Sequence, residues 1–174
     1  SGGSTLNQGT VALTTGSPFG TGPVNMTGSA ISLAGANANI PNTINLLAPL
    51  TTNIMGNANI SGFTGPMVGT GDVSWDWGSG TGTLTLSGGA TQFANLTNTF
   101  YLRSTTSGYF RYGGGGGARG VTFDLSDSFV TISSSGIQTI ELGALVGNTN
   151  TATLWASAGS SYIIGAKNLS TTFA

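Results

Sequence analysis

The stretch DVSWDWG, residues 72 to 78, carries side chains whose spacing could support chemistry. In an extended segment Trp75 and Trp77 lie on one face, and Asp72 and Asp76 lie on the other. One hypothesis is a carbohydrate site, with rings that stack on sugars and carboxylates that bind hydroxyls or act as an acid/base pair. The other hypothesis is that the tryptophans pack inward or at a subunit contact while the aspartates face water. Aspartates four residues apart on one strand face are separated by about 13 Å, too far for the usual glycosidase pair, so packing is favoured.

A second acidic pair, Asp124 and Asp127, occurs in FDLSDSF, residues 123 to 129. Residues three apart face opposite sides of a strand, although a turn could bring the two carboxylates together around calcium. No further acidic residues lie nearby in the sequence, so aspartates that cap turns are the favoured interpretation. We predict no metal site.

The chain offers few other groups for catalysis. It has no histidine, no cysteine and a single lysine, so the usual pairings of a nucleophile with a base are absent. The preferred zinc ligands are absent for the same reason. The sequence therefore predicts a protein that is not an enzyme, with no catalytic residue, cofactor or metal ligand.

The segment YFRYGGGGGARG, residues 109 to 120, contains five consecutive glycines. Each glycine loses much backbone freedom on folding, so we expect a mobile surface loop that interrupts the regular structure. Tyr109, Arg111, Tyr112 and Arg119 flank the glycine run, and tyrosine with arginine is a typical composition of interaction anchors.

The overall composition indicates strands and turns. Only nine of the 174 residues carry formal charge, whereas glycine, serine, threonine and asparagine abound, which disfavours helices. So few cations make nucleic acid an unsuitable partner. A net charge of −1 gives little electrostatic protection against association, so another copy of the chain is the expected partner. No stretch approaches membrane-spanning length.

Alternation of apolar and polar residues with a period of two recurs along the chain, as in half-buried strands of about five residues. We predict one all-β domain over residues 1–174. The residues expected in its core are Val11, Leu13, Ile31, Leu33, Leu84, Leu86, Ile132, Ile140 and Leu154. Alternation alone fits a β-sandwich or jelly roll as well as a parallel β-solenoid. Similar segments at 9–35, 80–100 and 144–173 favour the solenoid, because stacked repeats share one pattern.

Several of these segments resemble autotransporter-associated β-strand repeats: GTGTLTLSGG, NISGFTGPMVGTGD, GSPFGTGPVNMTGSAISL, LGALVGNTNTATL and YIIGAKNLSTTF. Residues 100 to 128 fit the repeat poorly. The resemblance implies a right-handed parallel β-helix on a bacterial surface. It implies no active site.

A solenoid with about 20 to 25 residues per coil would have about seven coils and a height of about 35 Å. No charged or helical cap is evident at either end, so each terminal strand would leave unpaired N–H and C=O groups. Head-to-tail pairing of such edges does not close and produces a filament. The expected contact residues are Thr5, Leu6, Val11, Leu13, Leu169, Thr171 and Phe173 near the ends, with Trp75, Trp77, Tyr109, Arg111 and Tyr112 as lateral contacts.

These expectations lead to two hypotheses of function. The first is a secreted structural subunit that self-associates into an extracellular or cell-surface filament. The second is a glycan-binding adhesin module that uses Trp75 and Trp77 with nearby polar side chains.

Overall fold

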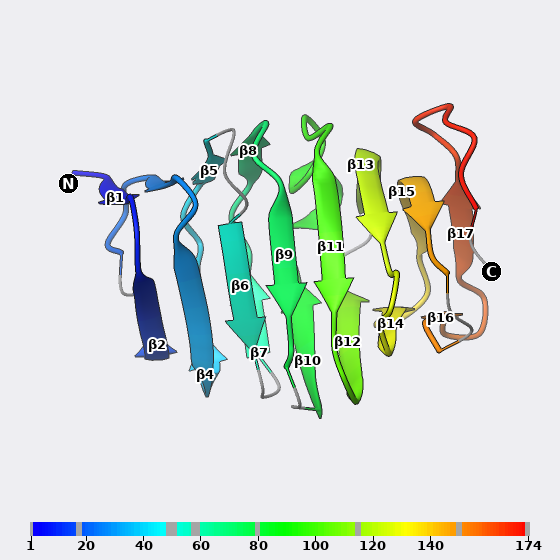
Figure 1. Cartoon of the computed structure of the whole chain (residues 1–174), viewed down its shortest axis with the longest axis horizontal. Coiled ribbons are helices and arrows are strands. Elements are labelled where there is room, and N and C mark those ends of the chain that lie inside the picture. The colour runs from blue at the N-terminus through cyan, green and yellow to red at the C-terminus, as the bar shows by residue number, and fades with distance from the viewer. Residues whose placement is uncertain are drawn as a thin grey trace.

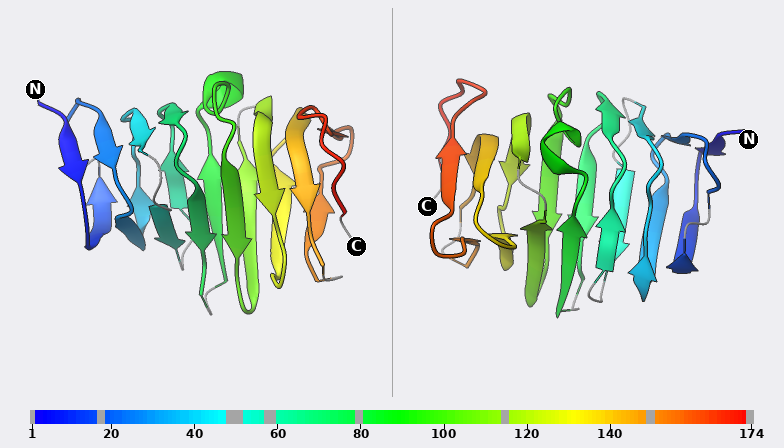
Figure 2. Two further views of the ribbon diagram at one scale, coloured as in Figure 1. Left: turned by 45° about the horizontal axis from the view of Figure 1, so that its top comes forward. Right: turned by 180° about the vertical axis from the view of Figure 1, so that it is seen from behind.

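The computed structural model describes residues 2–16, 19–47, 52–56, 60–78, 81–113, 116–148 and 151–172. These residues form a column of stacked coils in which each strand pairs in parallel with strands of the neighbouring coils (Figure 1). The fold is therefore the predicted all-β parallel β-solenoid, and not a sandwich or jelly roll. The two ends of the chain lie at opposite ends of the column (Figures 1 and 2).

Three parallel sheets form the walls of the column. The eight-stranded sheet contains, in order, β17 (Ser161–Ile164), β15 (Thr139–Val146), β13 (Gly116–Asp124), β11 (Thr99–Arg103), β9 (Val73–Asp76), β6 (Thr52–Gly56), β4 (Ala30–Ala38) and β2 (Thr10–Gly16). The five-stranded sheet contains β16 (Thr153–Trp155), β14 (Val130–Ser134), β12 (Ser107–Tyr112), β10 (Thr81–Leu86) and β7 (Ile60–Phe63). The four-stranded sheet contains β1 (Ser4–Leu6), β3 (Val24–Met26), β5 (Ile44–Leu46) and β8 (Met67–Gly69).

The length of a coil varies along the column. Thr10 pairs with Ala30, 20 residues later, whereas Val73 pairs with Phe100, 27 residues later. The long coil contains the 3₁₀ helix η1 (Gly89–Thr91), which forms a small bulge at the middle of the column (Figure 2). Insertions in one coil thus leave the pairing of the strands on either side intact.

Alternate residues of each strand fill the interior of the column. Six of the nine expected core residues are buried: Leu13, Ile31, Leu84, Leu86, Ile132 and Ile140. Val11 and Leu154 are partly buried and pack against this core. The side chain of Leu33 lies outside the described part of the structure. Alternation therefore identified the inward-facing positions correctly wherever they can be checked.

The glycine-rich segment differs from its expectation. Residues 109–112 belong to β12 and residues 116–120 belong to β13, so the prediction of a loop across residues 109–120 is wrong. Only residue 113 and the undescribed residues 114 and 115 lie between the two strands. A Cβ atom at Gly117 would collide with the backbone oxygen of Glu141 in the next coil, and one at Gly120 would collide with the backbone oxygen of Leu96. Both positions therefore require glycine because neighbouring backbone approaches so closely.

Buried amide side chains join the corners of successive coils. Asn42 donates from Nδ2 to the backbone oxygens of Gly20 and Gly22, at 2.9 and 2.7 Å. Gln92 donates from Nε2 to the backbone oxygen of Phe63 at 2.8 Å, and Asn98 donates to Gly71. Asn42 thus supplies a donor to two turn carbonyl groups, whereas the oxygen of Phe63 also accepts the backbone N–H of Ser87.

Candidate functional site

The DVSWDWG stretch is part of the wall and core of the solenoid. Trp75 is 0% exposed, and its ring makes edge-to-face contacts with Phe63, Phe100 and Phe110 at centroid distances of 5.3 to 5.6 Å. Trp77 is also buried. The favoured interpretation that the tryptophans pack inward is therefore confirmed. Their prediction as lateral contacts is wrong, and so is the alternative of a sugar platform.

The two aspartates of this stretch hold backbone. Asp72 Oδ1 accepts a hydrogen bond from the backbone N–H of Thr99 at 2.7 Å, across to the next coil. Asp76 Oδ1 accepts from the N–H of Gly78 at 2.7 Å. Both carboxylates thus stabilise turns and coil contacts, a structural role that needs no ligand.

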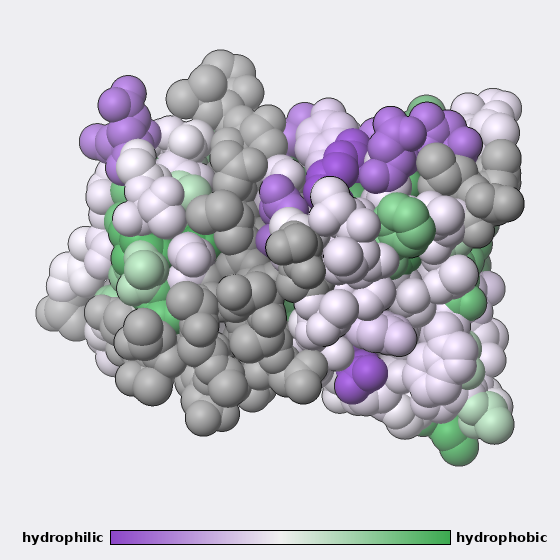
Figure 3. Space-filling view, turned by 60° about the horizontal axis from the view of Figure 1, so that its bottom comes forward, coloured by the Kyte–Doolittle hydropathy of each residue, from purple (hydrophilic) through white to green (hydrophobic). Residues whose placement is uncertain are grey.

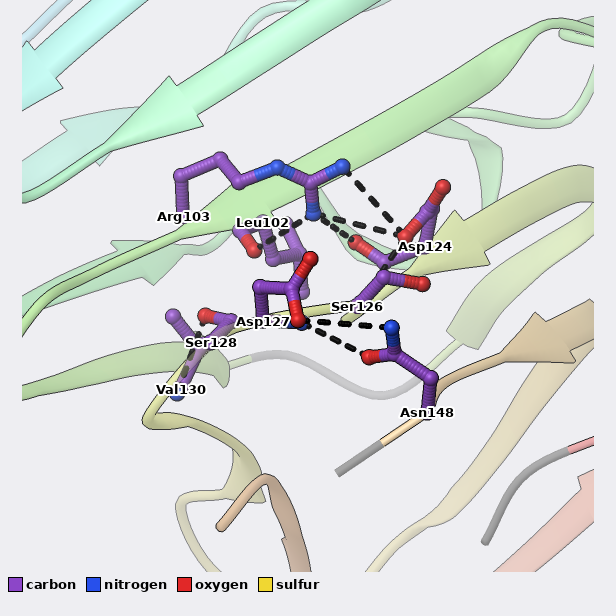
Figure 4. A network of polar contacts seen from close by, with 8 residues as sticks. All are labelled: Leu102, Arg103, Asp124, Ser126, Asp127, Ser128, Val130 and Asn148. Atoms are coloured by element: carbon purple, nitrogen blue, oxygen red, sulfur yellow. Dashed lines mark hydrogen bonds and ion pairs between the residues drawn. The ribbon is translucent and has the colours of Figure 1, made fainter. Parts of the chain in front are cut away.

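In the second acidic pair Asp124 caps a turn, as predicted, whereas the carboxylate of Asp127 contacts Asn148 of the next coil (Figure 4). Asp124 Oδ1 accepts from the N–H of Ser126 at 2.8 Å and forms an ion pair with Arg103 at 3.3 Å. Asp127, which has a left-handed φ of 54°, donates its N–H to Asn148 Oδ1 and accepts from Asn148 Nδ2. Within the described residues no group of three or more potential metal ligands occurs.

The N-terminal end of the column exposes two strand edges. Among the described residues β1 pairs only with β3, and β2 pairs only with β4. Leu6 and Val11 lie in register with the buried residues Met26 and Ile31, so they continue interior columns, and both are only partly buried. Thr5 is exposed on the outer side. Leu13, expected as a contact, is instead buried in the core.

The C-terminal end also exposes two strand edges. β17 pairs only with β15, and β16 pairs only with β14, among the described residues. Tyr162 and Ile164 lie in register with the buried residues Ile140 and Leu142, so their side chains close the end of the core. The hydroxyl of Tyr162 lies 2.8 Å from the backbone oxygens of Ile132 and Trp155. Burial raises the pKa of this phenol well above its ordinary value.

The segment after β17 returns beside β15. Gly165 donates its N–H to Leu142 O, and Gly147 donates its N–H to Thr172 O. Leu142 belongs to β15 and Gly147 directly follows it. Among the described residues β17 pairs only with β15, so its outward edge has no strand partner. Leu169 and Thr171, two of the expected contacts, are exposed on this segment. Phe173 lies outside the described residues.

The lateral candidates of β12 divide between surface and interior. Tyr109 is exposed and Arg111 is half-buried, whereas Tyr112 is buried beside Phe110. Tyr112 is therefore not a contact residue, because it occupies an inward position of the alternation. Burial raises the pKa of its phenol.

Trp155 on β16 is an exposed residue that the sequence analysis missed. It lies on the same outer face as Tyr109 and Arg111. Because Leu154 was expected to face the core, alternation indicated that its neighbour Trp155 faces outward. Figure 3 shows hydrophobic residues as separate patches among residues of intermediate hydropathy on one side of the column.

No protein-family model, no curated protein and no solved structure matches this chain. The described residues contain no helix with the length and apolar character needed to cross a membrane.

Proposed function

We propose that the protein is a structural subunit that assembles head to tail with copies of itself at strand edges. The observation that carries the proposal is that both ends of the column expose strands with one hydrogen-bonded neighbour each, among the described residues. Charged side chains are one of the devices with which natural proteins protect edge strands. None of the nine charged residues lies in β1, β2, β16 or β17.

The two ends are also suited to each other. Because every strand pair within the solenoid is parallel, the first strands of one copy have the direction needed to extend the last sheet of another. The apolar side chains of Leu6 and Val11 at one end would cover Ile164 and Tyr162 at the other. Such a contact joins different surfaces of the two copies, so it propagates into a filament rather than closing into a dimer.

We further propose that the assembly is extracellular or on a bacterial cell surface. The support is compositional: the chain is poor in charge, rich in threonine, serine, asparagine and glycine, and resembles exported bacterial β-helices. A carbohydrate-binding adhesin is the alternative function, but Trp75 and Trp77 cannot serve it from the core.

The test compares the 174-residue wild-type chain with Ile164→Lys and Leu6→Lys by sedimentation velocity and negative-stain electron microscopy. We expect wild type to form end-to-end filaments as concentration rises. Either lysine places a charge where a second copy would bury apolar surface, so each variant is expected to remain monomeric.

Thr91→Lys is the matched control. Thr91 is exposed on η1, at the middle of the column, so this added charge should leave assembly unchanged. Wild-type chains that stay monomeric at high concentration would overturn the proposal, as would filaments that persist in both end variants.

A further inference from the structure

One outer face of the five-stranded sheet gathers the exposed aromatic side chains of the described structure. These are Tyr109 on β12, at 40% exposure, Phe129 directly before β14, at 44%, and Trp155 on β16, at 52%. Elsewhere in the described residues aromatic side chains are buried or only partly exposed. Three exposed aromatic side chains on, or directly before, three adjacent strands indicate a surface adapted to a planar or ring-shaped ligand.

A cation lies among these aromatic residues. Arg111 on β12 is in register with Ser133 on β14, which is in register with Trp155 on β16. Its guanidinium carbon lies 6.0 Å from the centre of the Tyr109 ring. The face therefore combines exposed rings with one positive charge.

Arg111 differs from the other three cations, because it has no hydrogen-bond or ion-pair partner among the described residues. Arg103 pairs with Asp124, Arg119 pairs with Glu141 at 3.4 Å, and the Lys167 ammonium donates to two oxygen atoms. The Nε of Arg111 is buried without an acceptor, and so is the hydroxyl of the fully buried Ser133 beside it. Buried polar atoms usually have a partner, so Arg111 and Ser133 have unused hydrogen-bonding capacity.

We propose that this face binds an acidic saccharide, with the carboxylate of a uronic-acid-type sugar on Arg111 and sugar rings against Trp155 and Tyr109. A guanidinium can hold a carboxylate through two parallel hydrogen bonds. Aromatic rings provide apolar surface for the C–H faces of a sugar. Thr131 on β14 is in register with Tyr109, and Thr153 on β16 is in register with Thr131. Their hydroxyls lie 2.6 Å apart and add polar groups that can bind sugar hydroxyls.

Other occupants fit this face less well. A peptide strand would need an open sheet edge, and among β12, β14 and β16 only β16 offers one. A strand added there would have β14 and β16 between it and Arg111 on β12, so it would not use the cation of this face. Nucleic acid would need several cations to neutralise its phosphates, and this face has one. Because Trp155 lies on the terminal strand β16, binding must be measured at one fixed state of assembly.

The experiment is a glycan array that includes polyuronates and their neutral counterparts, followed by calorimetric titration with any oligosaccharide that binds. All variants carry Ile164→Lys, so that binding is measured at one state of assembly. We expect Trp155→Ala and Arg111→Gln each to weaken binding of the acidic saccharide by about tenfold or more. Arg111→Lys should fall between wild type and Arg111→Gln, because lysine keeps the charge but loses the bidentate geometry.

Two controls match these changes. Arg119→Gln removes the same charge at a cation that is already paired, and Ile137→Ala removes an exposed apolar side chain on a turn. Neither should alter binding. Failure of every acidic glycan to bind would overturn the proposal, as would equal losses in Arg119→Gln and Arg111→Gln, or preference for the neutral counterparts.

Discussion

The first coils and the middle coils of the solenoid fill the same backbone repeat with different side chains. Val24, Met26, Ile31, Ile44 and Leu46 line the N-terminal interior, and all are aliphatic and fully buried. In the middle the interior is aromatic, and its rings meet edge to face at centroid distances of 5.3 to 6.4 Å. Its members are Phe63, Trp75, Phe93, Phe100, Phe110, Tyr112 and Phe123.

The difference shows that the strand ladder sets the architecture while the interior side chains set how tightly the coils are joined. Trp75 on β9 contacts rings from β7, β11 and β12, so one side chain links strands of two sheets across the interior. The aliphatic residues of the first coils bury less surface each. We therefore expect the middle of the column to be the most stable part and the first coils to open more readily.

The largest expected effect is that of Trp75→Ala. Removal of this indole leaves a large cavity among three rings, which should lower the free energy of unfolding by about 3–5 kcal/mol. Equilibrium denaturation in urea measures the change. Trp155→Ala is the control, since it makes the same substitution at an exposed site and should cost much less. Equal costs at the two sites would contradict the aromatic cluster as the main source of stability.

A smaller loss of stability against unfolding is expected when a corner amide is removed from the first coils. Asn42→Ala would leave the backbone oxygens of Gly20 and Gly22 without their donor, at a cost of about 1–3 kcal/mol. Hydrogen exchange should show faster opening of the N-terminal coils alone. Asn95→Ala, at an exposed asparagine in the middle of the column, should change stability by no more than about 0.5 kcal/mol.

Ile44→Val removes one methylene group from the aliphatic interior, and the expected cost is about 0.5–1.5 kcal/mol. Thermal and urea unfolding of this variant, set beside Trp75→Ala, compares the two interiors directly. A cost as large as that of Trp75→Ala would show that the two regions contribute equally.

The smallest effect concerns pH at the C-terminal coil. Burial raises the folded-state pKa of Tyr162 above the ordinary value near 10, so the native state holds the phenol proton more tightly than the unfolded state. The resulting stability is present below about pH 10 and is lost as the pH rises further. Tyr162→Phe cannot lose this contribution, so the stabilities of wild type and variant should converge in alkaline solution. Urea unfolding at neutral and alkaline pH tests this, and a constant difference between the two proteins would contradict it. Tyr112, whose pKa is also raised, is present in both proteins.

Sequence alone identified the architecture in two steps: alternation indicated strands with one apolar face, and the similarity of segments 9–35, 80–100 and 144–173 favoured a solenoid over a sandwich. Ile31 and Ile132 are examples whose burial follows from the alternation. The glycine run was misinterpreted for a physical reason. Glycine usually marks loops, whereas Gly117 and Gly120 are needed because backbone from neighbouring coils approaches them. That approach depends on contacts between residues more than 20 positions apart, which the local pattern does not contain.

The lateral contact residues were harder to predict than the core. Alternation placed Trp75 and Trp77 together on one face, but it could not decide whether that face was inside or outside. Trp75 faces inward because aromatic residues from other coils, such as Phe100 and Phe110, pack around it. Trp155 escaped notice because its importance depends on Arg111, two strands away in the sheet.

The corner amides have a consequence for how the chain acquires its structure. Asn42, Gln92 and Asn98 each donate to carbonyl groups 20 to 29 residues earlier in the chain. Each of these amides therefore finds its acceptors already synthesised when it emerges. A polypeptide that leaves a ribosome or an export channel amino end first can therefore fold one coil at a time. Each new coil forms its corner hydrogen bonds with the coil already folded before it.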